Sequence, residues 1–154
     1  MKVKKLTIGI KNIPSINPIT KKFINRGYKG EIVAKYDKTK ELDYKLDTTK
    51  NTVAGDINIG NYLYQVKAKN CCIKLIKEIN EKASNMNELI DIYLKHSKAN
   101  RYIYVIEYNN ETYTITMNKQ EFKKFILAFG YYSKVKNQIR VFRSDNVIYN
   151  WATA

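Results

Sequence analysis

Alternating apolar and polar positions mark most of the strands that this chain is expected to form. Residues 42–47, for example, carry leucine, tyrosine and leucine alternately with charged side chains, which is the period of a half-buried strand. Turn residues at 60–61 and 109–110 each separate two such segments and predict antiparallel hairpins. Strands are predicted over residues 2–10, 42–47, 53–59, 62–68, 101–108 and 111–117, and residues 138–143 with 147–152 are expected to close the sheet or to form a terminal hairpin.

Apolar residues three or four positions apart predict the helices. Asn17 can cap a helix over residues 17–36 with Pro18 at its first position, and Glu31 falls on this helix. Its apolar stripe would consist of Ile19, Phe23, Ile24, Ile32 and Val33. Further helices are predicted over residues 70–85, 85–97 and 118–133.

The order of these elements predicts the fold class. After the N-terminal segment come a helix, three strands, two helices, two strands, a helix and one or two final strands, which favours an α+β or α/β architecture with a central mixed sheet flanked by helices. No internal repeat, long linker or Gly/Ser/Pro-rich tract interrupts the chain. Residues 1–154 are therefore expected to form a single domain.

Net charge is the strongest compositional signal. The chain has 28 lysine and arginine residues against 14 acids, which gives a net charge of +14. Residues 1–40 hold eleven of the basic residues and only two acids. Such an excess predicts a polyanionic partner, most simply nucleic acid, because cationic side chains that neutralise phosphates release condensed counterions. A solvated basic face is the alternative.

The cysteine and histidine content excludes several kinds of site. Cys71 and Cys72 are neighbours, and no other cysteine is available, so a disulfide framework is not expected. His96 is the only histidine and lies more than twenty residues away, which argues against a zinc enzyme and a Cys–His nucleophile. Two buried thiols on a helix and no apolar run of membrane or signal-peptide type predict a cytoplasmic protein with no membrane partner.

The first hairpin brings together residue types that suit a catalytic site. Side chains alternate across a strand, so Gln65 and Lys67 face one side and Val66 the other. Asp56 on the neighbouring strand can reach the Gln65 and Lys67 side if the register allows it. Glu31 would join them if its helix packs on that face.

These residues could bind a divalent cation and activate water. Mg²⁺ prefers hard oxygen ligands, which Asp56, Glu31, the Gln65 amide and the Val66 backbone carbonyl would supply, and Mn²⁺ can substitute for it. The metal would lower the pKa of a bound water and neutralise charge on a phosphate. Lys67 would then position or help to deprotonate that water and stabilise the transition state. The same spacing also fits an ordinary hairpin whose polar side chains face solvent.

A family resemblance favours the catalytic interpretation. The segments "GYKGEIVAKY" and "DTTKNTVAGDINIGNYLYQVKAKN", within residues 27–70, resemble the core of the PD-(D/E)XK nuclease superfamily, nearest to archaeal Holliday-junction resolvases and Mrr-type restriction endonucleases. In that core a glutamate lies on a first helix, an aspartate starts a strand, and an acid or glutamine, any residue and a lysine follow on the next strand. The matching positions are Glu31, Asp56 and Gln65–Val66–Lys67, with "NCCIKLIKEI" as the following helix.

The resemblance implies a restriction-endonuclease-like fold and a Mg²⁺-dependent DNA endonuclease that acts as a homodimer. Two positions depart from the family pattern. Gln65 replaces the acid of the triplet, as in Mrr-like nucleases, and Gly55 replaces the proline before Asp56. The amide of Gln65 contributes no charge to a cation.

Several alternatives remain open at this point. The protein could be an inactive nucleic-acid-binding member of the same fold, an RNA-cleaving nuclease or toxin, or a basic interaction module without nuclease ancestry. Phosphate contacts are expected from Lys21, Lys22, Arg26, Lys29 and Lys69. A second basic group either extends the phosphate-binding surface or forms a solvated edge; it consists of Lys134, Lys136, Arg140 and Arg143.

Overall fold

The main sheet of the protein has five strands and mixes parallel with antiparallel pairing. A computed structural model of the chain describes residues 1–45, 57–69, 71–75, 81 and 83–154. The strand order is β1 (Lys2–Lys5), β6 (Glu111–Met117), β5 (Arg101–Tyr108), β3 (Tyr62–Lys67) and β2 (Ile57–Ile59). Only β3 and β5 run parallel to each other. The central mixed sheet predicted from the sequence is therefore confirmed.

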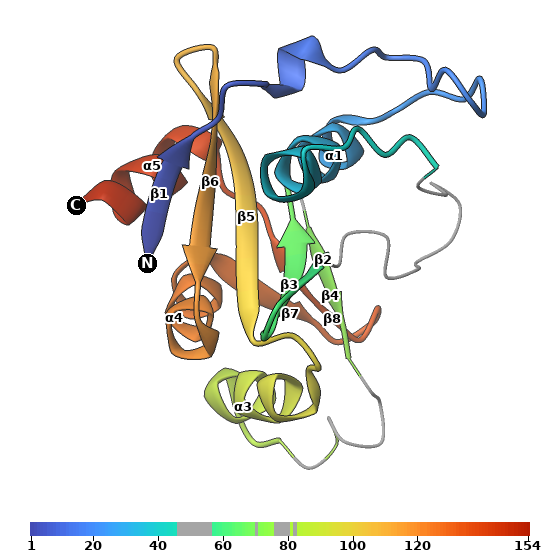
Figure 1. Cartoon of the computed structure of the whole chain (residues 1–154). Coiled ribbons are helices and arrows are strands. Elements are labelled where there is room, and N and C mark those ends of the chain that lie inside the picture. Colours follow the sequence, from blue (N-terminus) through green and yellow to red (C-terminus); the bar gives the residue numbers. More distant parts are fainter. Residues whose placement is uncertain (46–56, 70, 76–80, 82) are drawn as a thin grey trace.

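Helix α1 (Arg26–Thr39) covers one face of this sheet (Figure 1). Its buried residues 32–34 pack against Val66 of β3 and against Ile103 and Val105 of β5. Gly30 permits this close approach, because a Cβ atom there would lie 2.9 Å from the Cβ of Ala68 and 3.3 Å from that of Val105. The position of α1 over the end of β3 thus depends on the absence of a side chain at residue 30.

The opposite face of the main sheet carries the larger core. Three helices contribute to it, namely α3 (Met86–His96), α4 (Lys119–Phe129) and α5 (Asp145–Thr153). Tyr102 and Tyr104 of β5 point into this core, where Tyr102 stacks on Phe122 at a ring separation of 4.2 Å. Aromatic burial on this scale dominates the stability of a domain of this size.

A second, antiparallel sheet of three strands packs against the same core. Its order is β4 (Cys72–Lys74), β8 (Gln138–Val141) and β7 (Gly130–Ser133). Ile73, Ile139 and Val141 point inward and are buried. Because side chains alternate along each strand, the residues between them form an outer face that points away from the core.

Side-chain caps define where the helices begin. Asn25, Asn85, Asn118 and Ser144 precede α1, α3, α4 and α5, and each side chain accepts a hydrogen bond from the backbone N–H three residues on. These bonds satisfy donors that the first helical turn leaves without partners. A short 3₁₀ helix, η1 (Ile10–Asn12), follows β1.

Several predicted elements are confirmed, at least in part. The two hairpins form, with Gly60, Asn109 and Asn110 at positive φ in their turns, and helices occur within residues 85–97 and 118–133. The strand predicted over residues 2–10 is limited to β1. Two more strands were predicted, over residues 42–47 and 53–59. Residues 46–56 lie outside the described part of the chain, and residues 42–45 are not in a strand.

Other predictions are wrong in the described residues. The first helix begins at Arg26 and not at Asn17, whose Oδ1 instead accepts hydrogen bonds from the backbone N–H groups of Ile19 and Thr20 in a turn. Cys72–Lys74 forms a strand where a helix was expected, residues 130–133 belong to β7, and residues 147–152 lie in α5. The two cysteines are therefore not on a helix, and neither is in a disulfide.

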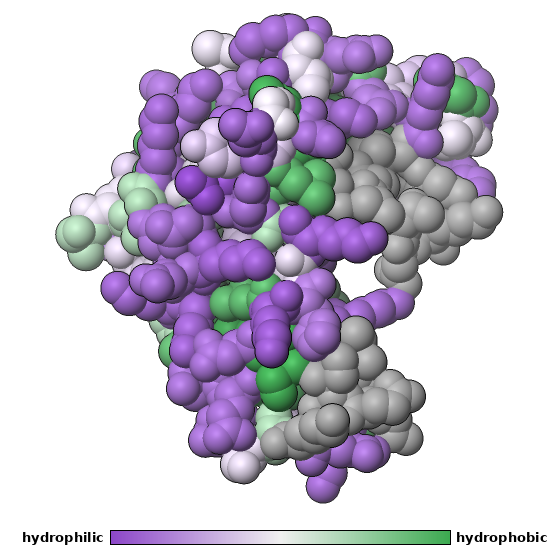
Figure 2. All heavy atoms as spheres, turned by 60° about the horizontal axis from the view of Figure 1, so that its bottom comes forward, coloured by the Kyte–Doolittle hydropathy of each residue, from purple (hydrophilic) through white to green (hydrophobic). Residues whose placement is uncertain are grey.

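The surface is largely polar. Hydrophilic residues dominate the face shown in Figure 2, and apolar atoms are restricted to smaller patches there. Within the described residues, no helix has the length and apolar character needed to cross a membrane.

Candidate functional site

A small pocket lies where the N-terminal end of α1 meets the end of β3. It has a volume of about 170 Å³. Helix α1 and its cap contribute four of the lining residues: Asn25, Gly27, Tyr28 and Glu31. The end of β3 and the chain that follows it contribute the others: Lys67, Ala68, Lys69, Cys71 and Cys72.

Glu31 supplies the carboxylate of this pocket. Gly27 and Glu31 are four residues apart in α1, so they lie on the same face of the helix, and this face is turned to the pocket. Glu31 is half-buried. The predicted placement of Glu31 on the first helix is confirmed, although that helix is shorter than expected.

Lys67 supplies a cation at the end of β3. It is the last residue of the strand and lies opposite Tyr104 in the parallel register with β5. Its Nζ donates a hydrogen bond of 3.3 Å to the carbonyl oxygen of Cys72, which holds the side chain at the pocket. The exposed Lys69 lines the same pocket. The described lining residues therefore comprise one acid and two lysines, an excess of positive charge that favours an anionic group.

Gln65 does not line this pocket, although the sequence placed it beside Lys67. Its Oε1 accepts a hydrogen bond of 2.9 Å from the hydroxyl of Tyr93 in α3. The physical reason lies in the packing of α1, which covers the face of β3 that carries Val66. Gln65 points to the other face, beside Tyr102 in the register with β5.

The proposed metal ligands are only partly represented. Glu31 lies in the pocket, Val66, whose backbone carbonyl was the expected ligand, is not among the lining residues, and Asp56 lies outside the described residues. The described part of the chain contains no group of three or more His, Cys, Asp or Glu residues close enough to hold a metal ion. One carboxylate in a pocket with two lysines does not suffice for Mg²⁺, so such a site requires Asp56.

The buried cysteine of the pocket, Cys71, does not resemble a thiolate site. Burial raises the pKa of the Cys71 thiol to about 12, and the nearby charge of Lys67 offsets this rise only in part. Cys71 is therefore protonated at neutral pH, and a protonated thiol is neither a nucleophile nor a good metal ligand.

The predicted phosphate-binding residues differ in their surroundings. Lys21 and Lys22 are exposed in the segment before α1, and Lys29 donates a hydrogen bond of 3.1 Å to the Ser15 hydroxyl. Arg26 instead forms ion pairs with two carboxylates, at 2.7 Å from Glu107 and 3.0 Å from Asp145. Its guanidinium group thus has a role within the fold, at the junction of α1, β5 and α5.

This junction was not anticipated from the sequence. Asp145 is only 9% exposed and accepts hydrogen bonds from the Arg26 guanidinium and from the backbone N–H of Glu107. The hydroxyl of Tyr104 is buried without a hydrogen-bond partner among the described residues, and burial is the main cause that raises its pKa. A signal was available, because Ser144 followed by an acid is typical of a helix start.

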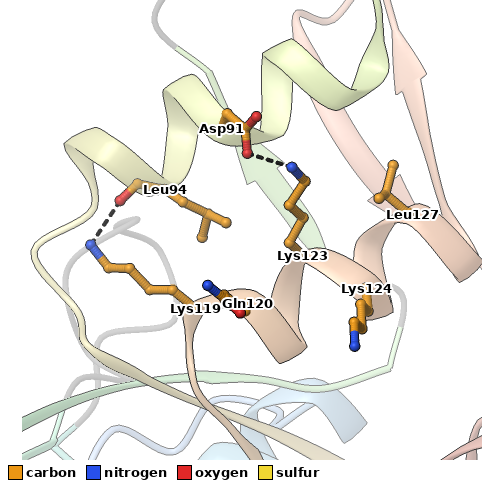
Figure 3. Close-up of a pocket in the computed structure, with 7 residues that line it drawn as sticks. All are labelled: Asp91, Leu94, Lys119, Gln120, Lys123, Lys124 and Leu127. Atoms are coloured by element: carbon orange, nitrogen blue, oxygen red, sulfur yellow. Dashed lines mark hydrogen bonds and ion pairs between the residues drawn. The ribbon is translucent and has the colours of Figure 1, made fainter.

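A larger pocket of about 540 Å³ lies between α3 and α4 (Figure 3). Two of the three lysines that line it bind groups of the protein itself: Lys119 donates a hydrogen bond of 2.8 Å to the carbonyl oxygen of Leu94, and Lys123 lies 2.7 Å from Asp91. These two contacts join the helices. This pocket brings none of the predicted catalytic residues together.

Comparisons with protein-family models, with curated proteins and with solved structures found no match for this chain.

Proposed function

We propose that the protein is a metal-dependent endonuclease that hydrolyses phosphodiester bonds, with its site at the pocket between α1 and β3. The observation that carries this proposal is the convergence of Glu31 and Lys67, from a helix and a strand far apart in the sequence, in one pocket. A carboxylate and a lysine in this relation can hold a water and a phosphate side by side.

The surroundings of the pocket favour a phosphate. Lys67 and Lys69 supply two positive charges, and the first turn of α1 adds the partial positive charge of a helix N-terminus. In the proposed mechanism Lys67 positions the attacking water and stabilises the negative charge that develops on the phosphate. Mg²⁺, bound by Glu31 and Asp56, would neutralise the phosphate and lower the pKa of the water.

The fold supports the same proposal at a coarser level. A helix that carries a glutamate and precedes the lysine-bearing strand agrees with the resemblance to PD-(D/E)XK nucleases, whereas β4 follows that strand where the resemblance implied a helix. We extend the proposal to a homodimer in the cytoplasm that acts on DNA in preference to RNA. The net charge of +14 suits any nucleic acid.

A cleavage assay tests this proposal. The purified protein is incubated with branched and linear DNA and with RNA of the same sequence, in EDTA, Mg²⁺ or Mn²⁺. Cleavage of DNA is expected only with a metal, and Asp56→Ala is expected to abolish it. Metal-independent cleavage, or full activity of Asp56→Ala, would contradict the proposed site.

One observation favours a second function, a nucleic-acid-binding protein that does not cut. The amide oxygen of Gln65 accepts a hydrogen bond from Tyr93 and lies outside the pocket, which leaves one ligand fewer for a metal. This alternative predicts salt-sensitive DNA binding without metal-dependent cleavage. DNA binding by the unchanged protein without cleavage in either Mg²⁺ or Mn²⁺ would support it.

A further inference from the structure

The outer face of the small sheet combines exposed aromatic rings with positive charge. Residues 130–143, which contain β7, β8 and their turn, include no acid and four basic residues. Tyr131 and Phe142 remain 46% and 43% exposed. Exposed rings of this size are costly to leave in water, so a surface that keeps them together is a candidate binding surface.

The two rings and one guanidinium group form a compact group. The rings of Tyr131 and Phe142 stack with their centroids 5.9 Å apart, and the Cζ of Arg140 lies 4.5 Å from the centre of the Phe142 ring. Tyr131 lies opposite Arg140 in the register of β7 and β8. The inward-facing residues of the same strands are buried, so this group points away from the core.

This face leads directly to the candidate catalytic pocket. Cys72 of β4 lies opposite Arg140 in the register with β8, and Cys72 also lines the pocket together with Glu31 and Lys67. Paired strands are about 5 Å apart, so Arg140 on β8 lies close to the pocket, and Tyr131 lies one strand further away on β7. Lys74 adds an exposed positive charge on β4, near the same edge.

We propose that this face binds unpaired nucleotides next to the bond that is cut, so that the substrate is a nucleic acid with a single-stranded segment at the site. Bases stack on Tyr131 and Phe142, and Arg140 and Lys74 contact the phosphates. Bases inside a duplex do not offer their faces to side chains, whereas every unpaired base does. The absence of acids from residues 130–143 matches the charge of such a strand. This inference rests on the proposed function for its partner, but its test does not require cleavage.

Binding is measured in EDTA by fluorescence anisotropy, with a labelled single-stranded DNA and a blunt duplex of the same sequence. Tyr131→Leu and Phe142→Leu are each expected to weaken binding of the single strand by about fivefold or more, since stacking on one aromatic side chain contributes that much, and to leave duplex binding unchanged. Phe142→Tyr keeps the ring and is expected to bind like the unchanged protein. Thermal unfolding of each variant shows that it is folded.

Tyr62→Leu is the matched control. Tyr62 is 43% exposed, and the Cζ of Arg101 lies 4.6 Å from the centre of its ring, so the control removes an equivalent ring from another strand. It is expected to leave binding of both DNA forms unchanged. If Tyr131→Leu weakens binding of the single strand and of the duplex equally, or weakens neither, the inference is overturned. It is also overturned if the protein self-associates and Tyr131→Leu abolishes this self-association without any effect on DNA binding.

The outcomes separate the two proposals. Metal-dependent cleavage, together with DNA binding that Tyr131→Leu does not change, would support the endonuclease proposal and contradict the proposed single-strand surface. Binding of single strands that depends on Tyr131, without any cleavage, would support the single-strand surface and contradict the endonuclease proposal. Absence of DNA binding at low salt would overturn both.

Discussion

Glu31 and Lys67 line one pocket. Helix α1, which carries Glu31, packs on one face of β3, whereas alternation along the strand assigns the Lys67 side chain to the other face. Lys67 is the last residue of its strand, so its side chain is not confined beneath the sheet in the way that Gln65 is. Its hydrogen bond to the carbonyl oxygen of Cys72 fixes it at this end. Of the catalytic residues predicted from the sequence, Glu31 and Lys67 are therefore the two that lie together in the described structure.

Gln65→Ala is expected to leave metal-dependent cleavage unchanged, because the side chain contacts Tyr93 and not the pocket. Loss of the hydrogen bond is expected to lower the free energy of unfolding by about 1 kcal/mol. Cleavage rates and urea denaturation of the same preparation measure both effects. A large loss of activity at unchanged stability would instead place Gln65 at the metal.

Gly30→Ala is expected to lower the free energy of unfolding by about 1–3 kcal/mol, because the added methyl group overpacks the contact with Ala68 and Val105. Urea denaturation measures the change. Gly27→Ala is the comparison in the same helix: its Cβ would meet the Asn25 Oδ1 at 3.3 Å and no atom closer, so it is expected to destabilise the protein less than Gly30→Ala. Equal destabilisation by the two substitutions would contradict the close seating of α1.

Asp145→Ala is expected to destabilise the protein by about 2 kcal/mol, because the backbone N–H of Glu107 loses its acceptor and the Arg26 guanidinium loses one of its two carboxylate partners. Asp91→Ala removes an ion pair whose carboxylate is 55% exposed, and is expected to cost less than about 1 kcal/mol. Chemical denaturation of both variants gives the comparison. Similar losses would show that the buried junction contributes no more than a surface pair.

The buried thiol of Cys71 predicts a dependence of stability on alkaline pH. In the unfolded chain this thiol ionises near its usual pKa of 9.0, whereas burial raises the pKa in the folded protein to about 12. Between these values the folded state holds more protons, so the free energy of unfolding is expected to fall as the pH rises above 9, by at most about 1.4 kcal/mol per pH unit from this group.

Cys71→Ala is expected to lose this contribution above pH 9, the value at which the unfolded thiol is half ionised. Three tyrosines whose pKa values are also raised keep their own contribution to the pH dependence at higher pH in this variant: Tyr102, Tyr104 and Tyr149. Urea denaturation across this range measures the slope for both proteins. The same slope in the two proteins would contradict the assignment to Cys71.

The sequence predicted the local parts of the structure well where short-range signals decide them. The hairpin that joins β5 and β6 follows from alternation and from Asn109–Asn110, both of which adopt positive φ. The start of α1 was missed because Asn17 caps a turn, after which Lys21 takes a positive φ. Asn25, the true cap, was equally suitable by residue type.

The candidate site was predictable in its residue types but not in its geometry. Alternation along β3 correctly separates Val66 from its neighbours. Packing between distant segments decides which face of the sheet α1 covers, above all at Gly30, Ala68 and Val105. No local sequence pattern predicts this choice. The same holds for β4, because the single buried residue Ile73 suits a helix as well as a strand.

The most direct test of the endonuclease site is the rate of Mg²⁺-dependent DNA cleavage by Glu31→Gln, Lys67→Ala and Lys124→Ala. Lys124 is exposed on α4 outside the site, so its substitution removes the same charge from the protein without changing the pocket. Glu31→Gln and Lys67→Ala are expected to reduce the rate by about a hundredfold or more, while Lys124→Ala cleaves at a nearly unchanged rate. Cleavage by Lys67→Ala at the rate of Lys124→Ala would contradict the site.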